Sequence, residues 1–242
     1  ESPLGFKLES QETVPSSGWK IEKVSDRKVR DEWKPLWGKR AVVEDHFNEL
    51  VIDLVNPAGQ PERMQLVVRG YNDGFAFCYK IPDGKGPCVN VQSELTAYNF
   101  AGDYTAWFYN GENHNIGPEK LTETDGTRLP VMTVKAGDKH YMAIHEACLE
   151  TGAPLVLQSK GGESLFSVAS KPTSLSPGYT SAWRVVLYGT TPGVLTDSHL
   201  LELLNPDPDS RYDFSWVKPG LAVWDWRING AVWDGFTYGM SY

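Results

Sequence analysis

The sequence lacks long apolar runs and an excess of basic residues. No uninterrupted apolar stretch approaches the roughly 18 residues that a membrane-spanning helix needs, so we expect no integral membrane protein. Acidic residues outnumber basic ones, 31 to 23, and the net charge is −8. Because nucleic-acid phosphates are bound by clustered lysine and arginine side chains, an acidic chain without such a cluster argues against nucleic-acid binding.

Cysteine is also scarce, with only Cys78, Cys88 and Cys148. Cys78 and Cys88 flank the segment YKIPDGKGP, a hairpin-like connection, so a disulfide across it is one interpretation. Three unpaired thiols are the other interpretation, and we favour it because three cysteines cannot all pair within one chain. The cysteine content therefore says little about the cellular compartment.

Helical periodicity is missing too, since no amphipathic segment extends beyond two helical turns. Short runs of β-branched and aromatic residues, bounded by glycine, proline, asparagine or aspartate, predict strands instead. Their alternation supports this, because Leu50, Ile52 and Leu54 would share one face of a strand. The frequent turns between these runs predict antiparallel sheets stacked as a sandwich. The strands that we expect lie at 64–71, 75–81, 129–136, 140–148 and 181–189.

A change in composition near the end of the chain indicates a boundary. The segment NPDPDSRYD (205–213) combines prolines with acidic residues, and the apolar run LAVWDW (221–226) follows it. Unbroken hydrophobicity predicts a strand that is buried on both faces, as in a parallel sheet. Four of the nine tryptophans lie in the last 28 residues. This stretch therefore resembles the start of a second domain.

Eight motifs, in order along nearly the whole chain, resemble those of glycoside hydrolase family 97, whose enzymes cleave α-glucosides or α-galactosides. The resemblance is to the amino-terminal domain and the start of the catalytic barrel. The motifs are DEWKPLWGKR (31–40), HFNELVIDL (46–54), RGYNDGFAFCYKIP (69–82), ELTAYNFAGDYTAWF (94–108), AIHEACL (143–149), SAWRVVLYG (181–189), SHLLELLNPDP (198–208) and SWVKPGLAVWDW (215–226).

The resemblance implies a mainly β fold in two parts. Residues 1–212 would form a large antiparallel β-sandwich, a supersandwich like that of galactose mutarotase. Residues 213–242 would begin a (β/α)8 barrel with its first strand, and both ends of the chain would be truncated relative to a complete enzyme. The catalytic carboxylates of the family lie on later barrel strands, so we expect none in this chain. The remaining barrel would then be its partner.

The resemblance also implies a Ca²⁺ site that is shared with the missing barrel. One glutamate of the sandwich domain contributes to it, from the loop after the AWF strand. Glu119 is the best match in this chain, and Glu112 and Glu123 are alternatives. Because calcium needs several oxygen ligands, one glutamate would be an incomplete site. An exposed loop glutamate is the competing interpretation.

Candidate contacts to an oligosaccharide or glycoside substrate lie in two places. Asp225, between Trp224 and Trp226, would stand at the carboxyl end of the first barrel strand, where barrel enzymes bind substrate. His114 and Asn115 could hydrogen-bond sugar hydroxyls from the loop that precedes Glu119. Core packing for the tryptophans and simple solvent exposure for the loop are the alternatives.

His145 and Glu146 are neighbours in a predicted strand, and adjacent residues of a strand point to opposite faces. We therefore expect that they do not bind one metal ion together. We expect a structural histidine and a glutamate that pairs with an arginine such as Arg184. No GxSxG motif is present, which argues against a serine hydrolase. The sequence thus predicts part of a glycosidase, and a non-catalytic carbohydrate-binding sandwich is the alternative. The resemblance to the family also implies a periplasmic or extracellular bacterial protein.

Overall fold

The computed structural model describes residues 5–10, 18–57, 59 and 61–221. The chain divides into two compact units, which are described separately. The first unit consists of Glu1–Trp33 and Val42–Asp207, and the second of Lys34–Ala41 and Pro208–Tyr242.

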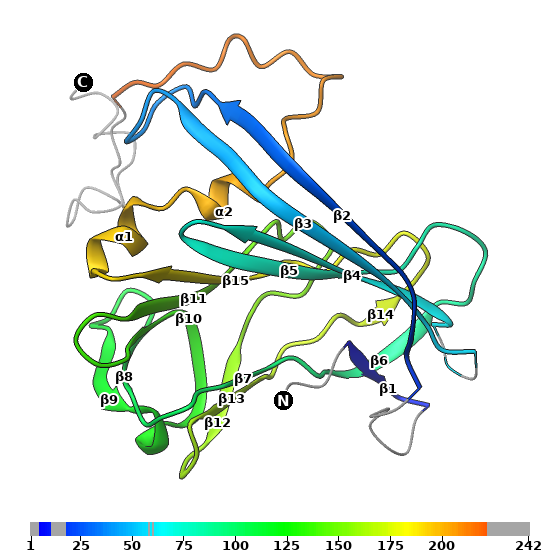
Figure 1. Ribbon diagram of the computed structural model, residues 1–242, viewed down its shortest axis with the longest axis horizontal. Helices are drawn as coiled ribbons and strands as arrows, with labels where there is room; N and C mark the ends of the chain where they lie inside the picture. Colours follow the sequence, from blue (N-terminus) through cyan, green and yellow to red (C-terminus); the bar gives the residue numbers. More distant parts are fainter. Residues whose placement is uncertain (1–4, 11–17, 58, 60, 222–242) are drawn as a thin grey trace, which may run out of the picture. The chain divides into compact units, whose positions relative to one another are not determined.

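The first unit is built on a 12-stranded sheet in which every strand pairing is antiparallel, as far as the described residues go (Figure 1). Two further strands, β8 (Thr105–Tyr109) and β9 (Ile116–Lys120), form a hairpin that joins the sheet through β10. The order of the other ten is β2 (Lys20–Trp33), β3 (Val43–Val55), β4 (Arg63–Tyr71), β5 (Gly74–Lys80), β15 (Trp183–Gly189), β11 (Tyr141–Ala147), β10 (Asp125–Lys135), β12 (Leu157–Lys160), β13 (Leu165–Val168) and β7 (Ala97–Asn99).

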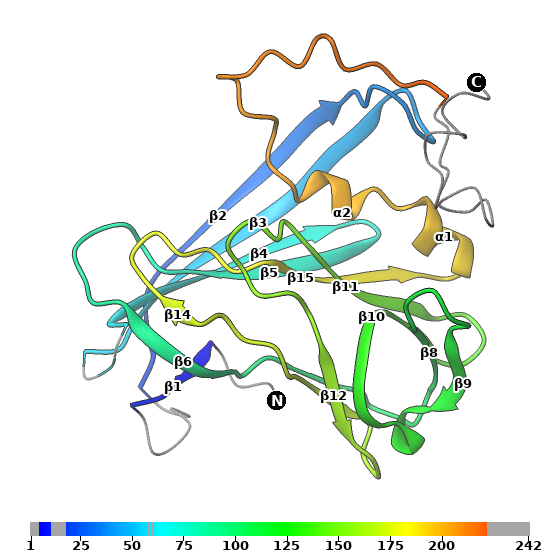
Figure 2. The same ribbon diagram turned by 180° about the vertical axis from the view of Figure 1, so that it is seen from behind.

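A second, three-stranded sheet covers part of the large one. It consists of β1 (Phe6–Leu8), β6 (Val89–Glu94) and β14 (Ser174–Leu175). Apolar side chains of this small sheet pack into one core cluster with residues of β3, β4 and β5, and Figure 2 shows the small sheet from behind. The fold is therefore mainly β, with large antiparallel sheets stacked as a sandwich, as the sequence predicted.

The strands predicted at 64–71, 75–81, 129–136, 140–148 and 181–189 are present, as β4, β5, β10, β11 and β15. Apolar side chains of β3 alternate between the two faces of the sheet, as the sequence predicted. Ile52 and Leu54 pack toward the small sheet, while Val51 packs on the other face. The two faces of β3 thus enter different core clusters, because side chains alternate along a strand.

Short helices cover the opposite face of the large sheet. Helix α1 (Pro192–Asp197) and helix α2 (Leu200–Leu203) lie against β15 and β11, where Leu200 packs with Val67, Cys78 and Val185. A 3-10 turn, η1 (Leu121–Glu123), follows β9. Within the described residues no helix exceeds two turns, and none is long and apolar enough to cross a membrane.

The connection between Cys78 and Cys88 is not a hairpin, and that part of the prediction was wrong. Cys78 lies in β5 of the large sheet, whereas Cys88 precedes β6 of the small sheet. Both edges of β5 are already paired, by β4 and β15, so the chain has to leave the sheet. All three thiols are free, which confirms the favoured interpretation, and burial raises the pKa of Cys78 to about 12.

The second unit has no helix or strand in its described residues, 34–41 and 208–221. Its side chains include an aromatic contact between Tyr212 and Phe214, whose ring centroids lie 6.2 Å apart. The strand predicted at 221–226 lies outside the described residues except for Leu221, so the predicted start of a barrel stays a prediction.

Candidate functional site

Glu119 lies on β9 of the β8–β9 hairpin, opposite Ala106. Its Oε1 accepts a hydrogen bond from the Thr124 hydroxyl at 2.8 Å and lies 3.2 Å from Nη2 of Arg128. Oε2 makes no such contact within the described part of the chain. The side chain is 22% exposed. The carboxylate is therefore held in one orientation, with one oxygen free to accept a further partner.

The other predicted hairpin residues are arranged more loosely. His114 and Asn115 are exposed in the turn between the two strands, where the carbonyl of His114 accepts a hydrogen bond from Nδ2 of Asn110 at 3.1 Å. Glu112 is exposed in the same turn, and the carboxylate of Glu123 accepts the Lys120 N–H at 3.1 Å. The hairpin thus carries Glu112, His114, Asn115 and Glu119, and Glu123 lies in η1 just after it.

No group of three or more histidine, cysteine, aspartate or glutamate side chains among the described residues is arranged to hold a metal ion. Glu119 by itself is only one ligand of the several that calcium needs. The predicted substrate contacts Trp224, Asp225 and Trp226 lie outside the described residues.

His145 and Glu146 point to different partners. Nδ1 of His145 accepts the N–H of Glu146 at 2.8 Å, and burial lowers the pKa of this histidine, so it is neutral at pH 7. The carboxylate of Glu146 accepts the N–H of Leu155 and lies 3.5 Å from Nη1 of Arg184. The predicted pairing of Glu146 with Arg184 is thereby confirmed.

Arg184 itself is buried, with 1% of its side chain exposed, and it links the two sheets. From β15 of the large sheet it donates to Glu94 on β6 of the small sheet, at 3.0 Å from Nε and 2.6 Å from Nη2. The two parallel hydrogen bonds between planar groups fix the geometry of this pair. Burial raises the pKa of the neighbouring Glu146, although Leu155 and Arg184 oppose this shift.

A second buried carboxylate, Glu49, is held between two arginines on the helix-covered face of the sheet. Arg27 on β2 donates from Nε at 2.6 Å and Arg69 on β4 at 2.7 Å. The Arg69 guanidinium also lies 4.5 Å from the Phe47 ring centroid and 4.9 Å from that of Trp183. Burial favours a raised pKa for Glu49, but the two arginine hydrogen bonds outweigh it and hold the pKa below its ordinary value.

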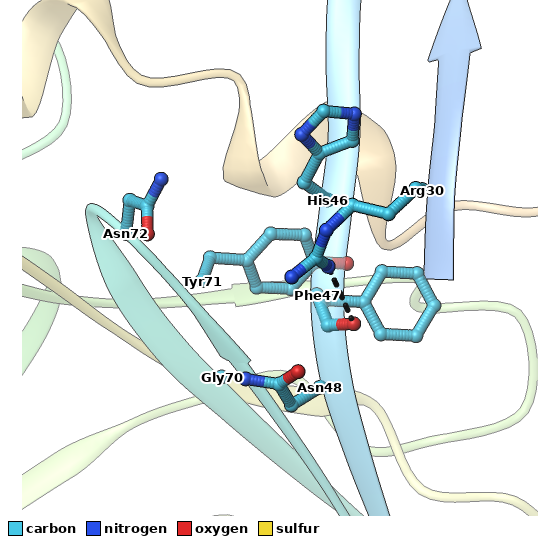
Figure 3. A pocket seen from close by; sticks show the side chains of 7 residues that line it. All are labelled: Arg30, His46, Phe47, Asn48, Gly70, Tyr71 and Asn72. Carbon is cyan, nitrogen blue, oxygen red and sulfur yellow. Dashed lines mark hydrogen bonds between the residues drawn. The ribbon is translucent and has the colours of Figure 1, made fainter. Parts of the chain in front are cut away.

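The opposite face of the same three strands is hollowed by a pocket of about 320 Å³, here called the β2–β4 pocket (Figure 3). Arg30 on β2 pairs with His46 on β3, and Asn48 pairs with Gly70 on β4, so all four share this face. Figure 3 shows Arg30 reaching toward the main chain of Phe47, whose carbonyl accepts from Nη1 at 3.4 Å. Tyr71 and Asn72 complete its lining.

Gly70 is the reason that the pocket is open. A Cβ built at this position would meet no atom within 4 Å, so a side chain here would stand in the pocket. Sequence reasoning missed this site, although an isolated glycine inside a strand pattern is a signal for a bulge or for close approach to the backbone. The ion pairs of Glu49 were also missed, because they depend on the register of three strands.

Comparison with known proteins then gives the family. The family described as Glycosyl-hydrolase 97 N-terminal matches residues 1–206. The chain belongs to this family. Among curated proteins it is 24% identical over 266 residues to the retaining alpha-galactosidase of Bacteroides thetaiotaomicron, covering 93% of this chain and 39% of the relative. It is 27% identical over 249 residues to a probable retaining alpha-galactosidase of Streptomyces bingchenggensis, covering 95% and 36%.

Solved structures agree with this membership. The chain resembles a glycoside hydrolase family 97 enzyme from Pseudoalteromonas sp. strain K8, solved in complex with acarbose and, as an E480Q variant, with panose. In both comparisons the TM-score is 0.78 and the identity 26%, covering 90% of this chain and 35% of the enzyme. A β-arabinopyranosidase shares the fold, with a TM-score of 0.65 and 18% identity. The chain thus spans little more than a third of the proteins it matches.

Proposed function

We propose that this domain works as the amino-terminal part of an α-glycosidase, of the α-galactosidase type rather than the α-glucosidase type. The match of the family over residues 1–206 carries this proposal, together with two relatives that are named as retaining alpha-galactosidases. In most glycosidase families a pair of carboxyl groups flanks the scissile bond, and retaining enzymes use one of them as a nucleophile. In this proposal both belong to the catalytic barrel.

The sandwich domain would support that barrel and lend its β8–β9 hairpin to the sugar site. Glu119 is suited to complete a Ca²⁺ site, because Thr124 and Arg128 fix its Oε1 while Oε2 is left open. His114 and Asn115, exposed on the same hairpin, would hydrogen-bond hydroxyls of an oligosaccharide or glycoside. Asp225 with Trp224 and Trp226 would contact the substrate from the first barrel strand. We further propose a periplasmic or extracellular location.

The experiment compares this chain with a longer protein that includes the barrel. Purified 242-residue chain should not hydrolyse p-nitrophenyl α-galactoside or α-glucoside, with or without calcium. The longer protein should hydrolyse the α-galactoside faster. Calcium-dependent turnover by the short chain would contradict the assignment of both carboxyl groups to the barrel, and a preference for the α-glucoside would contradict the galactosidase type.

A matched pair of variants tests the hairpin in the longer protein. Glu119→Gln should raise the calcium concentration needed for half-maximal activity at least tenfold, because a neutral amide is a weaker calcium ligand than a carboxylate. Glu112→Gln, in the exposed turn of the same hairpin, should leave it unchanged. Equal effects of the two substitutions would remove Glu119 from the metal site.

A further inference from the structure

We propose that the β2–β4 pocket is a further carbohydrate-binding site, which takes one pyranose ring of a neutral saccharide. The lining residues of the pocket lie on β2, β3, β4 and the turn after β4, so the site goes beyond the proposed role of the domain as a support for the barrel. Its volume of about 320 Å³ lies at the lower end of the range of small-ligand sites and suits a single sugar ring.

The polar groups of the pocket match sugar hydroxyls, each of which both donates and accepts hydrogen bonds. Asn48 and Asn72 each offer an amide that does both, and neither side chain is hydrogen-bonded within the described residues. Arg30 adds donors, and His46 can donate or accept. The pocket therefore presents four adaptable partners around an open floor at Gly70.

An exposed aromatic ring stands beside that floor. Phe75 on β5 is the register partner of Gly70, so it lies on the same face of the sheet one strand away, and it is 45% exposed. Residues directly opposite each other on neighbouring strands have Cβ atoms about 4.5–5.5 Å apart. The row Asn48, Gly70, Phe75 thus sets an amide and an aromatic ring on either side of bare backbone, an arrangement that suits the polar edge and the apolar face of a pyranose.

The charges favour a neutral ligand over a phosphate, a sulfate or an acidic sugar. Arg30 is the one permanently charged side chain that lines the pocket, and its Nη1 is already bonded to the carbonyls of Val29 and Phe47. His46 faces a carboxylate, with Nδ1 3.5 Å from the Glu44 side chain. A tightly bound anion needs several convergent cationic donors, which this pocket does not provide.

Binding is measured on the 242-residue chain by calorimetry and by ligand-observed NMR with methyl α-D-galactopyranoside and maltotriose. We expect millimolar affinity for at least one of them. Gly70→Val should weaken it at least tenfold, because the new side chain would stand on the floor of the pocket, where a Cβ meets no atom within 4 Å. Asn99→Val, at an exposed position of β7, adds an apolar side chain outside the pocket and should leave binding unchanged.

Two further arms keep the result unambiguous. If Gly70→Val does not fold, the exposed substitutions Asn48→Ala and Asn72→Ala together should give the same loss. Asn113→Ala, at an exposed position in the turn between β8 and β9 and outside the pocket, should leave the affinity unchanged. Absence of saccharide binding, binding that survives both pocket variants, or preferential binding of glucuronate or inorganic sulfate would overturn the proposal.

Discussion

At the scale of single residues, the buried carboxylates Glu49 and Glu94 show how charge is kept inside a β-sandwich. Each is held by arginine hydrogen bonds from another strand, and each joins segments far apart in sequence. Removing one partner of a buried pair leaves an uncompensated charge, which is far more costly than replacing both partners. Glu94 and Arg184 should therefore be among the most sensitive positions of the fold.

We expect Arg184→Met to destabilise the protein by about 3–5 kcal/mol, because the Glu94 carboxylate would stay buried without its partner. Denaturant unfolding followed by tryptophan fluorescence measures this loss. Arg63→Met serves as the control, since it breaks an exposed ion pair with Glu22 and should change the free energy of unfolding little. A similar loss for both variants would contradict the role given to burial.

The pKa of Glu49 predicts a dependence of stability on pH. Because this pKa is lower in the folded protein than in the unfolded chain, the stabilisation by Arg27 and Arg69 is fully present above about pH 4.5 and is lost as the pH falls through the folded value. Glu49→Gln should thus be less stable than the wild type at pH 7, and the difference should shrink below pH 4. A stability difference between Glu49→Gln and the wild type that does not change with pH would refute this prediction. Glu112→Gln, at an exposed position, is the control.

At the scale of elements, strands with alternating or continuous apolar residues were predictable and charged strands were not. The runs that became β4, β5, β10, β11 and β15 all contribute residues to the cores. By contrast, β2 escaped prediction because its side chains are mostly exposed and mostly polar, so no apolar periodicity marks it. Its position depends on pairing with β3, a long-range interaction that a local pattern cannot contain.

The β4–β5 hairpin offers a pair of glycines with opposite expected tolerance. A Cβ at Gly74, whose φ is 157°, would lie 2.4 Å from the carbonyl oxygen of Val186, whereas one at Gly70 would meet nothing within 4 Å. We expect Gly74→Ala to lower the free energy of unfolding by about 1–3 kcal/mol through backbone strain. Gly70→Ala should be tolerated. Thermal melts of the two variants check this, and equal stability would contradict the close packing of β5 on β15.

At the scale of the whole molecule, the fold and the family predicted from the sequence are confirmed, whereas the roles of the site residues stay predictions. Eight motifs in order along the chain identified the family, because each motif can be recognised from neighbouring residues alone. The contacts of Glu119 with Thr124 and Arg128 were not foreseeable, since they follow from the path of the chain after β9. The β2–β4 pocket was missed because it arises from an absent side chain at Gly70 and from the alignment of three strands.

Calcium should reveal the difference between this chain and a protein that also holds the barrel. A ligand that binds only the folded state raises stability in proportion to the logarithm of its concentration relative to Kd. In the proposed Ca²⁺ site Glu119 would be one ligand among the several that calcium needs, so we expect millimolar calcium to leave the melting temperature of the 242-residue chain unchanged. It should raise that of the longer protein, and less so after Glu119→Gln. A clear rise in the chain alone would show a complete site within it.

The charged residues of β2 also affect how readily the protein aggregates. This strand ends the order of strands described in the large sheet, and nine of its 14 residues are charged. A free strand edge is a template on which a second chain can add its own strand, the first step toward fibrous aggregates. On β2 such an addition would strip water from a dense row of lysine, arginine, aspartate and glutamate side chains. The same polarity that hid this strand from prediction thus disfavours growth of the sheet through this edge.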